Sequence, residues 1–235
     1  MRIFVDPAAL VAGALVVRGD EHHYLARVRR ARPGDALELV DGAGRRAVAT
    51  ITRIGDAETA LEAGPAERIV ARPPFVRALV PLIKGDRMDA CLEKLVEVGV
   101  DAIVVWPALR SVIRLDDARR EARLAKYRAI VQAAARQSGR AQIPSVDAAT
   151  GLAAALAGLP DGLRLVLDPT SDAALDPGVA QASDVTIASG PEGGLAPDEL
   201  DRLAGFMPLG LGPRVLRAET APLVAVALIR AATRS

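Results

Sequence analysis

The 235-residue sequence is poor in cysteine and histidine, and this scarcity excludes several kinds of site. Cys91 is the only cysteine, which rules out an internal disulfide and argues against a cysteine-ligated metal site. His22 and His23 have no third ligand near them in the sequence, so we interpret them as a structural or surface pair. We therefore expect no metal site, and the cysteine content favours a reducing, cytoplasmic location.

Long apolar runs and a net charge of one sign are also missing. The first ten residues, MRIFVDPAAL, lack the apolar core of a signal peptide, and no segment has the length needed to cross a bilayer. The 30 lysines and arginines nearly balance 29 aspartates and glutamates, for a formal charge of +1. We expect no membrane partner, and only the distribution of charge can indicate a nucleic-acid partner.

The first seventy or so residues have the pattern of a small β-rich domain. Residues 36–54, ALELVDGAGRRAVATITRI, contain two alternating apolar runs joined by a hairpin signal at 41–44, and TALEAG at 59–64 extends the same sheet. The sequence ARPP at 71–74 then breaks the strand pattern and disfavours helix before each proline. We predict two domains, residues 1–72 and 73–235.

From Phe75 onward, strand patterns alternate with helical patterns. The predicted strands are 75–82, 102–107, 163–169 and 184–189, and the predicted helices are 86–99, 117–138, 149–158 and 197–205. Residues 221–230, APLVAVALIR, are almost wholly apolar, so this last helix is expected to be buried on more than one side. Alternating strands and helices predict an open, mostly parallel α/β sheet.

Three glycine- or turn-rich segments follow predicted strands near the end of the chain: LDPTSD at 167–172, SGPEGG at 189–194 and PLGLGPRVLRAETAPL at 208–223. None is a P-loop, and none matches the dinucleotide-binding G-x-G-x-x-G pattern. SGPEGG lies between a strand and a helix start at Pro197, the kind of junction where open α/β sheets bind ligands. The alternative is that these glycines only form tight turns.

Two of these motifs carry a family resemblance. GPEGG at 190–194 followed by LGPRVLRAETA at 211–221 resembles the signature of the SPOUT-class RNA methyltransferases, specifically the family that methylates N3 of a uridine in 16S ribosomal RNA. Residues 22–44 resemble that family's N-terminal PUA-like RNA-binding barrel, and residues 84–100 resemble its first catalytic-domain helix. The resemblance covers essentially the whole chain. It implies a trefoil-knotted α/β catalytic domain, bound S-adenosylmethionine, and a homodimer formed largely through the C-terminal helix.

The residues themselves are consistent with that cofactor. Glycines let the main chain approach the adenosine or methionine portions, and leucines offer apolar walls to the adenine. The predicted cofactor-binding residues are Leu167, Gly190, Glu192, Gly193, Gly194, Leu209, Leu211, Gly212 and Leu216. For Glu192, the alternative is a carboxylate that satisfies loop amides or the N-terminus of the following helix.

Methylation of uracil N3 requires removal of an imide proton and stabilisation of the resulting negative charge, so a base and a cation are expected. Glu192 and Glu219 are the candidate bases, and Arg214 and Arg217 are the candidate cations. We prefer Arg217 and Glu219 as the catalytic pair because they flank the turn into the last helix. Glu219 could instead serve only the helix N-terminus, and oriented binding could supply most of the rate without a discrete base.

Basic residues concentrate in two segments. Residues 110–140 hold nine basic residues against three acids, a local balance of +6, and residues 22–32 contain four arginines without an acid. The predicted RNA-binding residues are Arg27, Arg29, Arg30, Arg32, Arg110, Arg114, Arg140 and Arg214. The alternative for each is a solvated arginine on a helix face. Arg136 departs from the family pattern, which usually has an acid before QSGR, so no catalytic role is assigned to it.

Two other functions stay open on the sequence alone. A SPOUT enzyme that methylates a ribose 2′-oxygen or another base would carry similar glycine loops. A noncatalytic RNA-binding protein would use the barrel domain and the basic segment as a clamp, but it would leave both glycine loops unexplained. The partner in each case is RNA, and for the leading hypothesis it is 16S ribosomal RNA or the small ribosomal subunit.

Overall fold

The computed structural model describes residues 1–70, 72–111 and 117–233, and its chain forms two compact units. The first unit comprises Met1–Ala71 together with Ala135–Ile143. The second comprises Arg72–Ala134 and Pro144–Ser235. The first unit therefore contains a segment that follows half of the second unit in the sequence.

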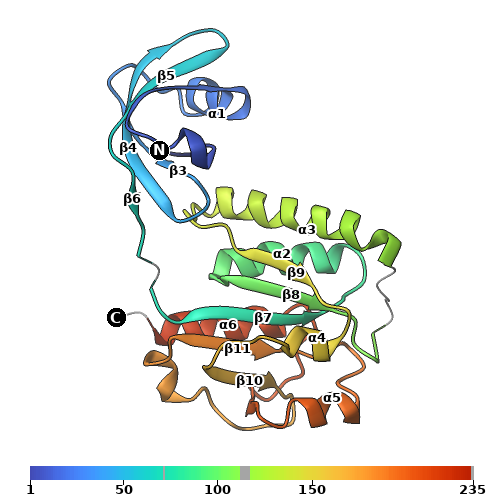
Figure 1. Ribbon diagram of the computed structural model, residues 1–235. Coiled ribbons are helices and arrows are strands. Elements are labelled where there is room, and N and C mark those ends of the chain that lie inside the picture. The colour runs from blue at the N-terminus through green and yellow to red at the C-terminus, as the bar shows by residue number, and fades with distance from the viewer. Residues whose placement is uncertain (71, 112–116, 234–235) are drawn as a thin grey trace. The chain divides into compact units, whose positions relative to one another are not determined.

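The first unit is built on one six-stranded sheet with the order β1-β3-β4-β5-β2, in which β6 also pairs with β4 (Figure 1). Its elements are β1 (Arg2–Phe4), β2 (Gly13–Arg18), α1 (Gly19–His23), β3 (Ala36–Val40), β4 (Arg45–Ile54), β5 (Glu58–Ala63) and β6 (Glu67–Arg68). β1 runs parallel to β3, and the remaining pairs are antiparallel. The predicted hairpin joins β3 and β4, and the predicted strand at 59–64 is β5, so both predictions are confirmed.

Local polar contacts fix the ends of this sheet. The buried Asp41 carboxylate, in the hairpin, accepts hydrogen bonds from the backbone N–H groups of Ala43 (2.8 Å) and Arg45 (2.9 Å) and from Arg45 Nε (2.6 Å). Burial by itself would raise the pKa of the Asp41 carboxyl. The hydrogen bonds outweigh this effect, so the pKa is lowered. His22 is buried with its ring nitrogens against Thr59 Oγ1 and Asp56 O, so it is structural, as predicted.

Arg136, which departs from the family pattern, lies in the segment that joins the first unit. Its guanidinium pairs with Glu21 at 2.7 Å and stacks over the Phe4 ring at 5.1 Å. Gln142 forms bridges to Gly42 and Ala43 in the same unit. Arg136 is therefore held by packing and charge within the first unit.

The second unit is built on a six-stranded sheet with the order β12-β10-β11-β7-β8-β9, and every pair is parallel (Figure 1). Its strands are β7 (Phe75–Pro81), β8 (Ala102–Trp106), β9 (Ser145–Ala148), β10 (Leu163–Leu167), β11 (Asp184–Ala188) and β12 (Met207–Leu209). Its helices are α2 (Asp86–Val98), α3 (Asp117–Gln137, which ends in the first unit), α4 (Leu152–Leu156), α5 (Pro197–Arg202) and α6 (Ala221–Ala232). The parallel α/β sheet is the predicted fold.

Within the second unit, the strands β9 and β12 were not predicted. They contain four and three residues, too short for an alternating pattern to stand out, and β12 includes Pro208. β12 lies at a sheet edge, where a proline removes no interior ladder hydrogen bond. α4 is shorter than predicted: it spans five residues, Leu152–Leu156, of the predicted range 149–158.

The ends of α2 follow the sequence signals. Gly99 has a left-handed φ of 106° and donates its N–H to Leu95 O and Val96 O, which ends the helix as predicted. The apolar stripe is buried: Met88, Cys91, Leu92, Leu95 and Val96. α6 differs from the prediction, because it buries one face in this chain while Leu228 on another side stays 42% exposed.

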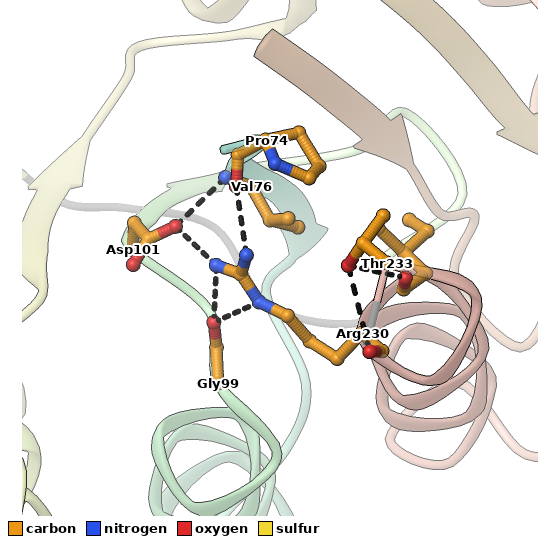
Figure 2. A network of polar contacts seen from close by, with 7 residues as sticks. Pro74, Val76, Gly99, Asp101, Arg230 and Thr233 are labelled. Atoms are coloured by element: carbon orange, nitrogen blue, oxygen red, sulfur yellow. Dashed lines mark hydrogen bonds and ion pairs between the residues drawn. The ribbon is translucent and has the colours of Figure 1, made fainter. Parts of the chain in front are cut away.

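Arg230 anchors the last turn of α6 to the sheet, as Figure 2 shows. Its guanidinium donates to Gly99 O through Nε (2.9 Å) and Nη2 (2.8 Å), to Pro74 O (2.7 Å), and to Asp101 Oδ2. The Asp101 carboxylate also accepts from Val76 N at 2.9 Å. One side chain thus joins α6 to the C-terminal end of α2 and the start of β7.

No helix in the described ranges 1–70, 72–111 and 117–233 has the length and apolarity to span a membrane.

Candidate active site

Three loops of the second unit meet because their strands are neighbours. β12, β10 and β11 are adjacent and parallel, so their carboxyl ends lie at one edge of the sheet. The loops that leave these ends are the three segments LDPTSD, SGPEGG and PLGLGPRVLRAETAPL identified in the sequence. The sheet order therefore brings together motifs that are separated along the chain.

The three loops enclose a cavity of about 560 Å³, within the size range of cofactor pockets. The lining comprises Val166, Leu167, Asp168, Pro169, Thr170, Ser189, Gly190, Pro191, Glu192, Gly194, Leu195, Leu200, Leu209, Leu211, Val215, Leu216, Arg217, Ala218 and Ala221. Most of these side chains are apolar, and three carry charge: Asp168, Glu192 and Arg217. An apolar cavity with a few charged groups suits a nucleoside-like ligand with charged substituents.

Glycines set the close approach of the loops. A Cβ built on Gly210 would lie 1.9 Å from Ser171 O, so only glycine fits between the loops after β10 and β12. Gly194 has φ of 72°, and its N–H donates to Pro191 O at 2.9 Å to close the turn. These glycines form tight turns and also shape the pocket, so the two sequence interpretations are not exclusive.

Seven of the nine predicted cofactor-binding residues line this cavity: Leu167, Gly190, Glu192, Gly194, Leu209, Leu211 and Leu216. Gly193 and Gly212 are not among the lining residues. A Cβ on Gly193 would approach Arg110 Cβ to 3.2 Å, and Arg110 Nη1 donates to Gly193 O at 3.2 Å. Gly193 thus faces the loop after β8, and Gly212 provides a turn with φ of 100°.

Of the predicted catalytic pair, Arg217 lines the cavity and Glu219 does not. Arg217 lines the cavity, and its side chain is 77% exposed. Glu219 is not among the lining residues; its side chain is 16% exposed, and its Oε1 lies 3.9 Å from Arg217 Nη1. Glu219 Oε2 is buried and accepts no hydrogen bond from the described residues.

Sequence reasoning missed Asp168, Thr170 and Arg87. Asp168 follows β10 in the segment LDPTSD, and its Oδ1 accepts from Thr170 N (2.8 Å) and Thr170 Oγ1 (2.7 Å). Its place directly after a strand was the available signal, since charged residues at the carboxyl end of a parallel strand face the edge where ligands bind. Arg87 contacts Glu192 and Glu219 from α2, and no local pattern connects it with residues more than a hundred positions away.

Cys91 is a buried residue of α2. Burial, with a smaller contribution from the Glu219 charge, raises the pKa of its thiol to about 12. A thiol in that state is neutral near pH 7 and does not serve as a nucleophile. Across the described parts of the chain, no three His, Cys, Asp or Glu side chains gather as a metal site.

The predicted RNA-binding residues fall in both units. Arg27, Arg29, Arg30 and Arg32 are all exposed in the first unit. In the second unit, Arg214 is exposed after β12 and Arg110 lies beside Gly193. Arg140, in the first unit, is half-buried, and Arg114 lies outside the described residues.

The count of +6 for residues 110–140 overstates the free positive charge, because several of these side chains already have partners. Lys126 pairs with Asp89 at 2.5 Å, and Arg128 lies 3.9 Å from Asp147; both acids lie outside the counted segment. Arg120 donates to Ala148 O, and Arg136 pairs with Glu21. The four arginines between Arg27 and Arg32 form no ion pair with a described residue, so theirs is the more available cluster.

Comparison with known proteins agrees with this geometry. A family described as RNA methyltransferase domain matches residues 72–230, and one described as RNA methyltransferase PUA domain matches residues 17–60. These matches confirm the SPOUT-type α/β fold class and the PUA-like N-terminal domain. The trefoil knot stays a prediction.

Individual relatives are similar over nearly their whole length. The ribosomal RNA small subunit methyltransferase E of Mycobacterium tuberculosis is 37% identical, covering 97% of this chain and 90% of that protein. The Bacillus subtilis protein of the same name is 28% identical over 91% of this chain and 88% of its own length. The crystal structure of ribosomal RNA small subunit methyltransferase E from Neisseria gonorrhoeae, bound to S-adenosyl methionine, is 29% identical with a TM-score of 0.81 and covers 98% of this chain and 96% of that one. The chain therefore belongs to the RNA methyltransferase family, as an enzyme with a PUA domain and a methyltransferase domain.

Proposed function

We propose that this protein transfers the methyl group of S-adenosylmethionine to N3 of a uridine in 16S ribosomal RNA. The observation that carries the proposal is the cavity between the three loops after β10, β11 and β12. Residues of both family motifs line this cavity. The names of the relatives support small-subunit ribosomal RNA as the substrate. The Neisseria gonorrhoeae structure supports S-adenosylmethionine as the cofactor.

The residues of the cavity fit this cofactor. Leu167, Leu209, Leu211 and Leu216 offer apolar contact to an adenine ring. The carboxylates of Asp168 and Glu192 complement the cationic ammonium and sulfonium groups. Gly190 and Gly194 complete the predicted set at the wall, while Gly193 and Gly212 shape the loops that carry it.

The chemistry is divided between cofactor and protein. S-adenosylmethionine supplies an electrophilic methyl group on a sulfonium. Arg217 is proposed to hold the uracil oxygens while N3 loses its proton, because it is the cation of the cavity wall. Glu219 is proposed to accept that proton, since its carboxylate lies 3.9 Å from Arg217, although it is outside the cavity lining. Glu192, which lines the cavity, is the second candidate.

The RNA is proposed to be bound by arginines of both domains, with residues 1–72 as the RNA-binding domain and 73–235 as the methyltransferase domain. Arg110 and Arg214 are proposed to contact RNA near the cavity, because they lie on or beside its loops. The exposed cluster Arg27, Arg29, Arg30 and Arg32 is proposed to bind phosphates, with Arg140 and Arg114 as further contacts. The enzyme is proposed to act in the cytoplasm, because its proposed substrate is ribosomal.

We also propose a homodimer formed through α6. Leu228 is 42% exposed on this almost wholly apolar helix, and Leu223 and Val224 are half-buried. A second copy would remove this apolar surface from water. Sedimentation of wild-type protein and a Leu228→Glu variant tests it: the wild type should sediment as a dimer and the variant as a monomer.

The decisive experiment is methylation of purified small subunits and of free 16S RNA with S-adenosylmethionine, followed by mass spectrometry of the released nucleosides. A product methylated at uridine N3 is expected. A ribose-methylated product would favour the other SPOUT chemistry, and no product together with RNA affinity would favour a noncatalytic RNA-binding protein.

A matched pair of variants connects that activity with the cavity. Leu211→Glu puts a charge into the apolar wall and should abolish calorimetric binding of S-adenosylmethionine. Val48→Glu adds the same charge at a side chain that is 67% exposed on β4 and should leave binding unchanged. Equal binding by both variants would contradict the assignment of the cavity.

A further inference from the structure

We propose that Arg87 is a positioning residue that joins the two motif loops of the cofactor site. Its guanidinium Nη1 lies 2.9 Å from Glu192 Oε1 and 3.7 Å from Glu219 Oε2. Glu192 belongs to GPEGG, and Glu219 belongs to LRAETA. One cation on α2 therefore contacts one carboxylate from each loop, an arrangement we call the Arg87 bridge.

The burial of these groups indicates what the bridge does. Glu219 is only 16% exposed, and its Oε2 is buried without a hydrogen-bond donor among the described residues. A buried carboxylate without a donor is unfavourable unless a cation compensates its charge. Arg87 approaches that oxygen, whereas Arg217 approaches the other oxygen only to 3.9 Å. Arg87 is the nearest compensating charge for Glu219.

An arginine at the N-terminal end of a helix is electrostatically unfavourable. The position of Arg87 is therefore better explained by its contacts with the two loops than by α2 itself. It is the second residue of α2, beside Asp86 in the first turn. The N-terminal end of a helix carries partial positive charge, so an arginine there is repelled and acids are preferred. Contacts with Glu192 and Glu219 offset that repulsion, and neither contact is local to α2.

The bridge predicts how the cofactor site responds to its loss. Glu192 lines the cavity, and Glu219 lies two residues from the lining residue Arg217. Without Arg87, two carboxylates that share a cation repel each other and move apart. Both loops should then become more mobile, and a cavity that they enclose should bind its ligand more weakly. The effect on the ligand rests on the proposed function, but the effect on the loops does not.

The first test uses ligand-free protein and hydrogen exchange. Gly194 N–H bonds to Pro191 O, and Thr220 N–H bonds to Arg217 O, so these two amides report on the two loops. Arg87→Met should speed exchange at both by roughly fivefold, since a partly exposed ion pair is worth up to about 1 kcal/mol. Lys94→Met is the matched control, because Lys94 lies on the same helix and pairs only with Glu93 and Glu97 there.

A third amide separates local from global effects. Gly99 N–H, at the other end of α2, should exchange at the wild-type rate in Arg87→Met. Arg87→Lys should recover part of the protection, because a lysine keeps the positive charge on a shorter side chain. Unchanged exchange at Gly194 and Thr220 in Arg87→Met would overturn the proposal.

The second test measures S-adenosylmethionine affinity by calorimetry in a double-mutant cycle. Arg87→Met and Glu192→Gln should each weaken binding by roughly fivefold, and the double variant should be little worse than either. Fully additive losses would overturn the bridge as a coupling between Arg87 and Glu192. If wild-type protein bound no S-adenosylmethionine, the proposed function would fail, and hydrogen exchange would still decide the bridge.

Discussion

Gly210 lies where the loop after β10 passes closest to the loop after β12. Its N–H donates to Ala173 O at 2.9 Å, and Ser171 O occupies the space that a side chain would need. Other glycines nearby have open space or flexible neighbours, such as Gly190, where the nearest atom belongs to the Leu195 side chain. Gly210 therefore allows the loops after β10 and β12 to approach each other closely.

Replacing Gly210 with alanine should push the loop at 168–173 away, because the contact is with backbone. We expect a loss of about 1–3 kcal/mol in the free energy of unfolding and roughly tenfold weaker cofactor binding. Gly205→Ala is the control, since a Cβ there meets no atom within 4 Å. Calorimetry and urea unfolding of both variants check the prediction, which would be wrong if Gly210→Ala behaved like the control.

Cys91 makes the stability of the protein sensitive to alkaline pH. Its folded pKa of about 12 lies above the unfolded value, so the folded state holds the proton more tightly. This contribution is complete below about pH 8.5 and is lost as pH rises toward 12, at up to about 1.4 kcal/mol for each pH unit.

Urea unfolding at pH 8 and pH 10 measures this effect. The wild type should lose more stability between the two pH values than Cys91→Ala does. In the folded protein at pH 8, the thiol should also resist a disulfide reagent that labels the unfolded chain completely. Rapid labelling of folded protein would show that the thiol is accessible and ionised.

At the scale of elements, α6 shows how an end is anchored. Its buried face is Pro222, Ala225, Val226 and Ile229, and α6 packs against α2 and against β7, β10 and β11. Arg230 in the last turn satisfies the carbonyls of Gly99 and Pro74 and pairs with Asp101 (Figure 2). A cation near a helix C-terminus also interacts favourably with the helix dipole.

Arg230→Ala should lower the free energy of unfolding by about 2–3 kcal/mol, because two carbonyls lose their donor and Asp101 loses this cation. Arg230→Lys should recover only part of it, since an ammonium cannot reproduce the planar fork. Arg202→Ala is a control at an exposed arginine in the last turn of α5. Thermal and urea unfolding test the order wild type, lysine variant, alanine variant; an alanine variant as stable as the Arg202 control would contradict it.

At the scale of the whole molecule, charge matters through its distribution. The chain is nearly neutral, and many of its basic residues are engaged in ion pairs such as Arg46 with Glu67 and Lys126 with Asp89. The cluster Arg27, Arg29, Arg30 and Arg32 is exposed, and its members have no ion-pair partner in the described part of the chain. Free cations of this kind release counterions when they bind phosphates.

Neutralising this cluster should weaken RNA binding and flatten its salt dependence. Each lost phosphate contact lowers the slope of log K against log salt by about 0.7–0.9. Gln is suitable at three positions, and Asn at Arg30, whose φ of 50° favours a residue that tolerates the left-handed region. Arg46→Gln, at a paired arginine, is the control.

Fluorescence anisotropy with a 16S RNA fragment, repeated over a range of salt concentrations, gives this slope. A quadruple variant with the wild-type slope would show that the cluster does not contact phosphates. Cofactor affinity in the same variant should stay at the wild-type value, because none of the four residues lines the cavity.

Local signals were sufficient to predict much of the fold. The hairpin at Asp41, the apolar stripe and glycine cap of α2, and the start of α5 at Pro197 each depend on residues that are close in sequence. The two motifs could also be identified from the sequence, because glycine-rich segments and a family signature are recognisable without any knowledge of the sheet. Short elements such as β9 and β12 were missed, since three or four residues show no period.

By itself, the sequence determined the parallel α/β class and the family, and seven of the nine residues that it assigned to the cofactor line the cavity, because propensity, periodicity and motifs are local properties. Tertiary structure decided what depends on strand order and on contacts between distant residues. It brought Asp168 into the same cavity lining as the two motifs, left Glu219 out of that lining, and placed Arg87 in contact with Glu192 and Glu219. Those contacts join residues of three separate loops and of α2, and only the packing of the sheet and its helices defines them.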